Sequence, residues 1–369
     1  MSTITYPIVK QYFWYKEKLN DTHLEKSLPI IYLNYKYYIF YEENDKITEL
    51  PYTNIYFFNK TTYYCISFTI ADEDTTVKIL RHHYRIVQIY INGGWDWKIK
   101  QPILEKYKSD LELIRRIGKR ADEVSMARFL AQDLIIETKP DATPVTDADK
   151  ATERAIREIL EAERLEDGIL GEEFGSDITG KKRYWVIDPI DGTKSFLRGL
   201  PVWSTLIALI EVTGDDHEVV VGLVSSPALA RTWFATKGGG AYTTFATYKN
   251  GEPRKISVSK VSNIKDAHVG YSDFVGFADR LDGFKSIFDE AWRTRAVGDF
   301  WSHMLVAEGV MDVAVEPSLA LWDMAPLDIV VREAGGTFTD LDGNNGPFGK
   351  GGLSTNGLLK DSVLKRLNV

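Results

Sequence analysis

Runs of aromatic and β-branched residues dominate the first hundred positions of the chain, and acidic or Asn- and Gly-containing pieces separate them. Such residues favour the pleated, half-buried surface of a β-strand. The runs lie at residues 30–43, 54–60, 61–74 and 78–93. We therefore expect a small β-rich or α+β domain over residues 1–101, in which no residue suggests catalysis.

From about Pro102 the apolar positions follow a helical period instead. Seven of them recur at three- and four-residue steps between Leu104 and Val124, which predicts one apolar stripe of a long helix. A second helix is expected at about residues 150–163. Strand, turn and helix signals then repeat to the end of the chain, so a larger α/β domain is expected over residues 102–369.

The segment Trp185–Leu200, WVIDPIDGTKSFLRGL, joins an apolar strand to the start of a helix. Asp188 and Asp191 stand at this strand-to-helix turn, and Pro189 between them fixes one backbone angle. Two carboxylates beside the N–H groups of a helix N-terminus suit cations and a phosphate group. The alternative is a capped turn with incidental acids.

Residue usage changes sharply near position 100. Fourteen of the 19 tyrosines lie before residue 101, 26 of the 28 glycines lie after it, and Ala71 is the only alanine among the first hundred residues. This difference indicates two separately derived domains, joined naturally or as an engineered fusion.

The net charge of −8 argues against a nucleic acid or an anionic membrane as partner. No apolar run has the length of a membrane span, and the N-terminal residues lack a signal-peptide pattern. The single cysteine, Cys65, excludes an internal disulfide framework and a cysteine-based metal site. A soluble cytoplasmic protein is expected.

Three conspicuous features have structural explanations. His82 and His83 are adjacent on a predicted strand, so they face opposite sides and cannot readily chelate one ion. Lys237-Gly238-Gly239-Gly240 lacks the Gly-Lys-Ser/Thr ending of a phosphate loop, and a hairpin turn explains it better. Asp147 is expected to be a cap residue of the helix at 150–163.

Two further acidic positions frame the central segment. Glu172-Glu173 follows a short predicted strand, and Asp323 lies in the first turn of a late helix that ends at Gly335-Gly336. Alone, such acids are typical of a solvated loop and of a helix N-terminus.

Together, Gly171-Glu172-Glu173, the segment Asp188–Thr193 and Trp322–Pro326 resemble the inositol monophosphatase superfamily in order and spacing. That superfamily consists of Mg²⁺-dependent, lithium-sensitive phosphatases. Within it, residues 298–317 and 322–336 are most similar to the bacterial histidinol-phosphate phosphatases. The resemblance covers roughly residues 109–369 and leaves the first hundred residues unexplained.

The resemblance implies a layered α/β/α/β/α sugar-phosphatase fold, a homodimer, a small phosphate monoester as substrate and two to three Mg²⁺ ions. Carried over residue by residue, it assigns Glu172, Asp188 and the carbonyl of Ile190 to a first metal site. Asp188 bridges to a second site with Asp191 and Asp323, and a third, weaker ion leans on Glu172.

The resemblance also implies roles in water activation and phosphate binding. Thr193 would help Glu172 to orient and deprotonate the attacking water, and Asp149 would hydrogen-bond Thr193. Backbone N–H groups of Gly192 and Thr193 would hold the phosphate, and Lys139 matches a loop lysine near the site.

Substrate choice is implied by two more acids. Glu316 aligns with the acid that meets the polar side of the leaving group, and Asp299 lies on a second substrate-facing segment. Carboxylates there suit the ammonium group of histidinol, and Glu316 equally suits a sugar hydroxyl. Residues Phe300, Trp301 and His303 could stack on an imidazole ring or belong to a helix core.

Three functional hypotheses follow. The first is a Mg²⁺-dependent phosphatase that converts L-histidinol phosphate to L-histidinol during histidine synthesis. The second is an inositol-1-phosphate or broad sugar-phosphate phosphatase with the same mechanism. The third is an interaction or fusion protein whose N-terminal domain binds a partner. Ala325-Pro326, where inositol monophosphatases usually have Ala-Ala or Ala-Gly, weakens the second hypothesis.

Overall fold

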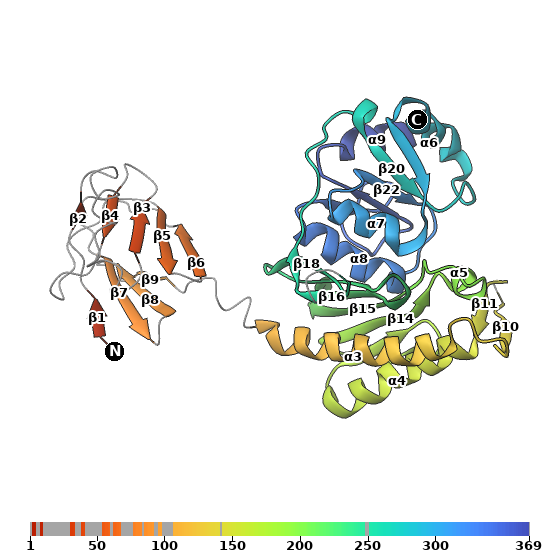
Figure 1. Cartoon of the computed structure of the whole chain (residues 1–369), viewed down its shortest axis with the longest axis horizontal. Helices are drawn as coiled ribbons and strands as arrows, with labels where there is room; N and C mark the ends of the chain where they lie inside the picture. Colours follow the sequence, from red (N-terminus) through yellow and green to blue (C-terminus); the bar gives the residue numbers. More distant parts are fainter. Residues whose placement is uncertain are drawn as a thin grey trace. The chain divides into compact units, whose positions relative to one another are not determined.

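The computed structural model describes residues 106–140, 142–247 and 251–368 in full, and before residue 98 the backbone of short strands alone. The chain divides into two compact units, Met1–Pro102 and Ile103–Val369, and each is described by itself (Figure 1).

The first unit contains two antiparallel sheets, in agreement with the predicted β-rich domain. The four-stranded sheet has the order β1 (Ser2–Ile4), β7 (Val77–His82), β8 (Arg85–Ile91), β9 (Trp95–Trp97). The five-stranded sheet has the order β2 (Ile8–Val9), β4 (Tyr38–Phe40), β3 (Ile30–Leu33), β5 (Asn54–Asn59), β6 (Thr62–Ser67). The side chains of His82 and His83 and the expected helix start at Pro102 lie outside the described residues.

An eight-stranded sheet is the largest sheet described in the second unit (Figure 1). Its strand order is β13 (Gly175–Ser176), β12 (Gly168–Gly171), β14 (Arg183–Asp191), β15 (Ser204–Thr213), β16 (Asp216–Ser226), β17 (Arg231–Thr236), β18 (Gly240–Phe245), β19 (Arg254–Lys255). All neighbours are antiparallel except β12 and β14, which run parallel.

Helices cover both faces of this sheet, which explains the almost uninterrupted apolar sequence of β14. Trp185 and Ile187 pack with α3 (Lys108–Arg128) and α4 (Asp147–Glu163) on one face. Tyr184 and Val186 point to the other face and pack with α8 (Leu321–Glu333). A strand that is buried on both sides needs no polar alternation.

A second sheet lies beyond α7 (Asp299–Ala307) and α8, with the order β21 (Arg293–Ala296), β20 (His268–Tyr271), β22 (Val313–Glu316), β24 (Gly352–Thr355), β23 (Thr337–Thr339). Helices α6 (Leu281–Glu290) and α9 (Lys360–Leu367) cover its outer face through an apolar cluster that includes Val313, Phe284 and Val363. The layers therefore run helix, sheet, helix, sheet, helix, and the expected α/β/α/β/α fold is confirmed (Figure 1).

Smaller elements complete the second unit. The hairpin β10 (Ile136–Thr138) and β11 (Pro144–Thr146) precedes α4, and the five-residue helix α5 (Thr193–Leu197) follows β14. Short 3₁₀ turns occupy Pro227–Leu229, Ile264–Asp266 and Ala278–Arg280.

Helix α4 begins at Asp147, three residues before the expected start. Thr146 is the N-cap, because its hydroxyl accepts the N–H groups of Ala148 and Asp149, and the carboxylate of Asp149 accepts the N–H of Thr146 in return. The prediction that Asp147 is a cap residue was therefore wrong: Asp147 is the first helical residue, and its carboxylate accepts the N–H of Ile135 and pairs with Arg128 at 3.0 Å.

Residues 237–240 form the predicted hairpin turn between β17 and β18, where Glu333 accepts the N–H groups of Gly238 and Gly240. In α7, Phe300 packs on Trp233, and the buried His303 packs on Phe338, so the helix core accounts for both rings. Within the fully described ranges, no helix combines the length and the apolar composition needed to cross a membrane.

Candidate active site

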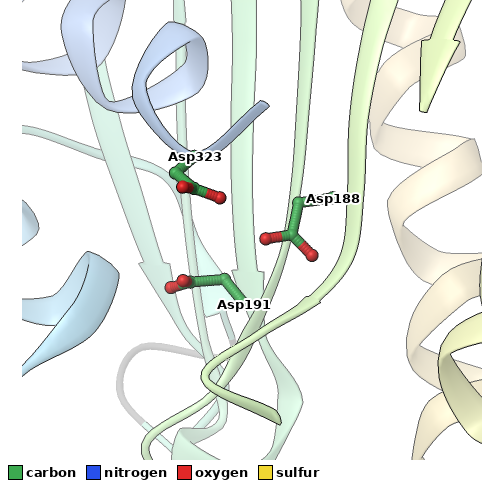
Figure 2. A group of neighbouring side chains, drawn as sticks. All are labelled: Asp188, Asp191 and Asp323. Atoms are coloured by element: carbon green, nitrogen blue, oxygen red, sulfur yellow. The ribbon is translucent and has the colours of Figure 1, made fainter. Parts of the chain in front are cut away.

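Three aspartates converge where the large sheet meets α8. Asp188 and Asp191 come from the end of β14, and Asp323 comes from the first turn of α8. One carboxylate oxygen from each lies within 4.8 Å of the other two, and Figure 2 shows the three groups around a shared space. Carboxylate oxygens at such separations are typical ligands of hard divalent cations.

The strand geometry brings Asp188 and Asp191 together. Pairing of β14 with β15 is regular as far as Asp188, opposite Leu206, and then becomes irregular before Asp191, opposite Ser204. Ile190 donates its N–H to Asp188 Oδ1 at 2.9 Å. This local bulge places two carboxylates three residues apart in the same space, which a regular two-residue alternation would not do.

Backbone N–H groups from two helices hold the other carboxylate oxygens. Asp191 Oδ2 accepts the N–H of Phe300 at 3.0 Å, at the start of α7. Asp323 Oδ2 accepts the N–H of Ala320 at 2.7 Å, at the N-cap of α8. Both carboxylates are thus oriented before any cation binds.

Burial and mutual repulsion raise the free energy of the ionised carboxylates in this cluster. Burial, with the neighbouring charges of Glu172 and Asp323, raises the pKa of Asp188 well above its ordinary value. Burial and the charges of Asp299 and Asp323 do the same to the pKa of Asp191, and burial raises the pKa of Asp323 to about 6. A bound divalent cation would supply the opposing charge, so the donor set fits Mg²⁺.

Glu172 and Lys139 lie at the edge of this cluster. Glu172 follows β12, and its N–H bonds to the carbonyl of Ile187 on β14 at 3.1 Å. Lys139, from the β10–β11 hairpin, donates to Glu172 Oε1 and to Glu173 Oε1, each at 2.7 Å. The structure therefore brings Lys139, which the resemblance matches to a loop lysine near the site, into contact with Glu172 and Glu173.

Thr193 and Asp149 are also in contact, at the start of α5 and α4 respectively. The hydroxyl of Thr193 lies 3.3 Å from Asp149 Oδ1 and 3.1 Å from the carbonyl oxygen of Ile190. Asp149 Oδ2 accepts both the N–H and the hydroxyl of Thr146. Gly192, with φ of +83°, supplies the left-handed conformation that lets β14 turn into α5.

A second acidic group lies on the side of the smaller sheet. Ser272 donates its hydroxyl to Glu316 Oε1 at 2.5 Å and accepts the N–H of Asp299 at 2.9 Å. A Cβ placed on Gly192 would lie 3.2 Å from Asp299 Oδ2, so this carboxylate borders the turn after β14. Burial, with the charges of Asp299 and Asp273, raises the pKa of Glu316 to about 8.

Sequence reasoning missed two residues that hold this region together. Ser272 ties Glu316 to Asp299, and its position directly after β20 was the only available signal. Glu153, in the middle of α4, accepts backbone N–H groups from the turn after Glu172. A glutamate at a fully buried helix position is the signal that could have identified it.

Residues 106–367 match the inositol monophosphatase family. A histidinol-phosphatase of Mycobacterium tuberculosis is 51% identical over 261 residues, which cover 70% of this chain and 98% of that protein. A histidinol-phosphatase of Streptomyces coelicolor is 50% identical over 264 residues, with 71% and 98% covered. Among solved structures, an IMPase of Thermotoga maritima superposes with a TM-score of 0.60 at 30% identity, covering 72% of this chain and 97% of that one.

The layered fold and the carboxylate cluster define the class of protein, and the sequence matches agree with them. The chain belongs to the inositol monophosphatase family of phosphatases.

Proposed function

We propose that this protein is a Mg²⁺-dependent phosphatase that hydrolyses L-histidinol phosphate to L-histidinol and phosphate. The observation that carries the proposal is the convergence of Asp188, Asp191 and Asp323, a partly buried group of carboxylates that suits hard cations. Two relatives called histidinol-phosphatases, each about half identical over nearly their whole length, support the choice of substrate.

Five residues would hold two or three Mg²⁺ ions: Glu172, Asp188, Ile190 through its carbonyl oxygen, Asp191 and Asp323. When bound, Mg²⁺ lowers the pKa of a water molecule and neutralises phosphoryl oxygens. The protein contributes rigid placement, because N–H groups at the start of α7 and α8 already orient Asp191 and Asp323.

Thr193 and Glu172 would orient and deprotonate the attacking water. The hydrogen of the Thr193 hydroxyl is directed to Asp149 or to the carbonyl oxygen of Ile190, so its lone pairs remain to accept a hydrogen from water. Glu172 would act as the general base that receives the proton of the attacking water. The water would attack phosphorus in line with the leaving oxygen, so that the P–O bond to histidinol breaks as the new P–O bond forms and phosphorus inverts without a phosphoenzyme. The leaving alkoxide would take its proton from solvent.

Gly192 and Thr193 would hold the phosphate with their backbone N–H groups. Helix α5 has only five residues, so its dipole is small and these N–H groups act as individual donors. Lys139 adds a positive charge at the same edge through its contact with Glu172.

Glu316 and Asp299 would recognise the ammonium group of histidinol. Ser272 links them, Glu316 is buried and Asp299 is half-buried, so water would compete only in part for a cation bound there. A polyol presents hydroxyl groups instead, which is the basis of the alternative, an inositol-1-phosphate or sugar-phosphate phosphatase. The structural likeness to the Thermotoga IMPase keeps that alternative as the competitor.

The homodimer is a proposal that rests on the resemblance to the family, and the cytoplasmic location is a proposal that rests on the composition of the chain. Light scattering of the purified protein tests the first. The hypothesis of an interaction or fusion protein depends on residues 1–101, whose side chains lie outside the described part of the chain.

Phosphate release from L-histidinol phosphate and from myo-inositol 1-phosphate, at equal concentration, tests the proposal. We expect turnover with Mg²⁺, none with EDTA, and a strong preference for histidinol phosphate. A preference for inositol phosphate would agree with the proposed reaction and refute histidinol phosphate as the preferred substrate. Absence of turnover with both esters would refute the proposal that the protein is a phosphatase.

A further inference from the structure

The turn that carries Glu172 is held by a side chain that is distant in sequence. Glu153, on α4, directs its carboxylate at the backbone of this turn. Its Oε2 accepts the N–H of Glu173 at 2.7 Å, and its Oε1 accepts the N–H of Phe174 at 3.3 Å. The side chain is fully buried, so these bonds do not compete with solvent.

Arg157 makes the buried charge of Glu153 tolerable and extends the contact. Its Nε lies 2.7 Å from Glu153 Oε1, one helical turn away. Its Nη2 donates to the carbonyl oxygen of Gly175 at 2.6 Å. The Glu153–Arg157 pair therefore binds the turn at three successive residues, two through N–H groups and one through a carbonyl.

The two glycines that flank the turn fit this arrangement. A Cβ on Gly171 would lie 1.9 Å from Glu153 Oε1, so any larger residue would displace the carboxylate. Gly175 has φ of +72°, a conformation that favours glycine. The pattern Gly171-Glu172-Glu173-Phe174-Gly175 thus describes a turn folded around the carboxylate of Glu153.

Glu172 stands between two fixed points. On one side its own N–H bonds to Ile187, in continuation of the sheet. On the other side the next two N–H groups bond to Glu153. With the backbone fixed at both ends, the carboxylate of Glu172 is directed toward Lys139 and the cluster around Asp188.

We propose that Glu153 is a positioning residue of the metal site: its carboxylate fixes the turn after β12 and thereby aims Glu172 at the cation. The inference rests on the proposed function, because it assumes that Glu172 is a metal ligand. Side chains that orient ligands in this way are commonly worth about 10–100-fold in metal affinity or activity.

The test compares Glu153→Gln with Glu158→Gln, the same change at an exposed position of the same helix. Mn²⁺ affinity without substrate is measured by electron paramagnetic resonance, alongside the half-saturating Mg²⁺ concentration, the KM for the ester and the Tm. We expect Glu153→Gln to weaken Mn²⁺ binding about tenfold or more and to raise the Mg²⁺ requirement equally, with KM changed less than about twofold. Glu158→Gln should match the wild type.

A folded Glu153→Gln variant with unchanged Mn²⁺ affinity overturns the inference, because a purely structural residue would lower only the Tm. If Glu153→Gln does not fold, Arg157→Lys replaces it. Lysine keeps a positive charge beside Glu153 but cannot also donate to Gly175. We therefore expect Arg157→Lys to weaken Mn²⁺ binding less than Glu153→Gln does. Unchanged Mn²⁺ binding in Arg157→Lys would overturn the inference.

Glu172→Gln separates this inference from the proposed function. If the wild type binds no Mn²⁺, or if Glu172→Gln binds it as tightly as the wild type, the metal assignment itself is wrong. If Glu172→Gln weakens binding and the Glu153 variant does not, only the positioning role fails.

Discussion

At the scale of single residues, the site combines carboxylates that repel one another with backbone groups that hold them in place. Asp188 is buried and Asp191 is half-buried, and burial together with mutual repulsion raises the pKa of both carboxyl groups. The N–H groups of Ile190 and Phe300 nevertheless fix both side chains. Such a site is arranged to bind a cation, and without the cation the repulsion lowers the stability of the folded protein.

Replacement of Asp191 by asparagine should abolish Mg²⁺-dependent turnover, with a loss of at least about a hundredfold, because the variant lacks a charged ligand. The same change removes one repelling charge, so without Mg²⁺ the Tm should equal or exceed that of the wild type. Asp361→Asn, at a fully exposed position, is the control. A variant with a near-normal rate would refute the assignment of Asp191 as a ligand.

Glu316→Gln tests recognition of the ammonium group. We expect kcat/KM for L-histidinol phosphate to fall about tenfold or more, since a hydrogen bond to a charged group contributes roughly 1.5–3 kcal/mol. For myo-inositol 1-phosphate, which carries no amine, the change should be much smaller. Steady-state kinetics with both esters decide the matter, and equal losses would assign Glu316 no role in amine recognition.

At the scale of secondary-structure elements, the contact of α3 with β16 contains an ionisable group that is not one of the proposed metal ligands. Asp122 Oδ2 accepts the hydroxyl of Ser225 at 2.9 Å, and Oδ1 is buried without a hydrogen-bond partner among the described residues. Burial raises the pKa of Asp122 to about 7. The carboxyl group is therefore protonated in the native state at pH values where the unfolded chain is ionised.

This raised pKa predicts a pH-dependent stability. Between about pH 4 and pH 7 the native state binds more protons at Asp122 than the unfolded state, so the free energy of unfolding falls as the pH rises. Asp122→Asn should raise the free energy of unfolding more at pH 8 than at pH 5, with a difference between the two on the order of 2 kcal/mol.

Thermal unfolding of Asp122→Asn at the two pH values provides the check. Glu112→Gln, on an exposed position of α3, should show no such difference. A Tm increase of the same size at pH 5 and pH 8 would mean that the carboxyl group of Asp122 does not titrate in this range.

At the scale of the whole molecule, the family match accounts for one of the two units. Residues 106–367 match the family, and the alignments of 261 and 264 residues cover 98% of the length of each of the two histidinol-phosphatases compared above. All proposed ligands belong to the unit Ile103–Val369, which has its own apolar cores.

A chain that begins at residue 103 should therefore fold and turn over substrate. We expect its kcat/KM to lie within about threefold of the full chain, because domains with their own core commonly fold alone. Circular dichroism and phosphate release provide the comparison. Insolubility, or a loss of more than about tenfold, would show that the first unit is needed for folding or activity.

Much of the fold followed from the sequence because its signals are local. The apolar stripe of α3, the doubly buried run of β14 and the turn at residues 237–240 all appeared where their patterns predicted. The start of α4 was misplaced because Thr146, and not Asp147, is the N-cap whose hydroxyl accepts the first N–H groups of the helix.

The sequence by itself determined two adjacent carboxylates, Asp188 and Asp191, on one strand-to-helix turn, since their spacing and their apolar lead lie within a single segment. The resemblance to a family added Asp323. Only the tertiary structure decided that the start of α8 places Asp323 beside that turn. It also decided that Ser272 binds Glu316 and that Glu153 binds the turn after Glu172. These contacts join residues far apart in the chain, and no local pattern of apolar and polar positions encodes which side chains the packing of layers will bring together.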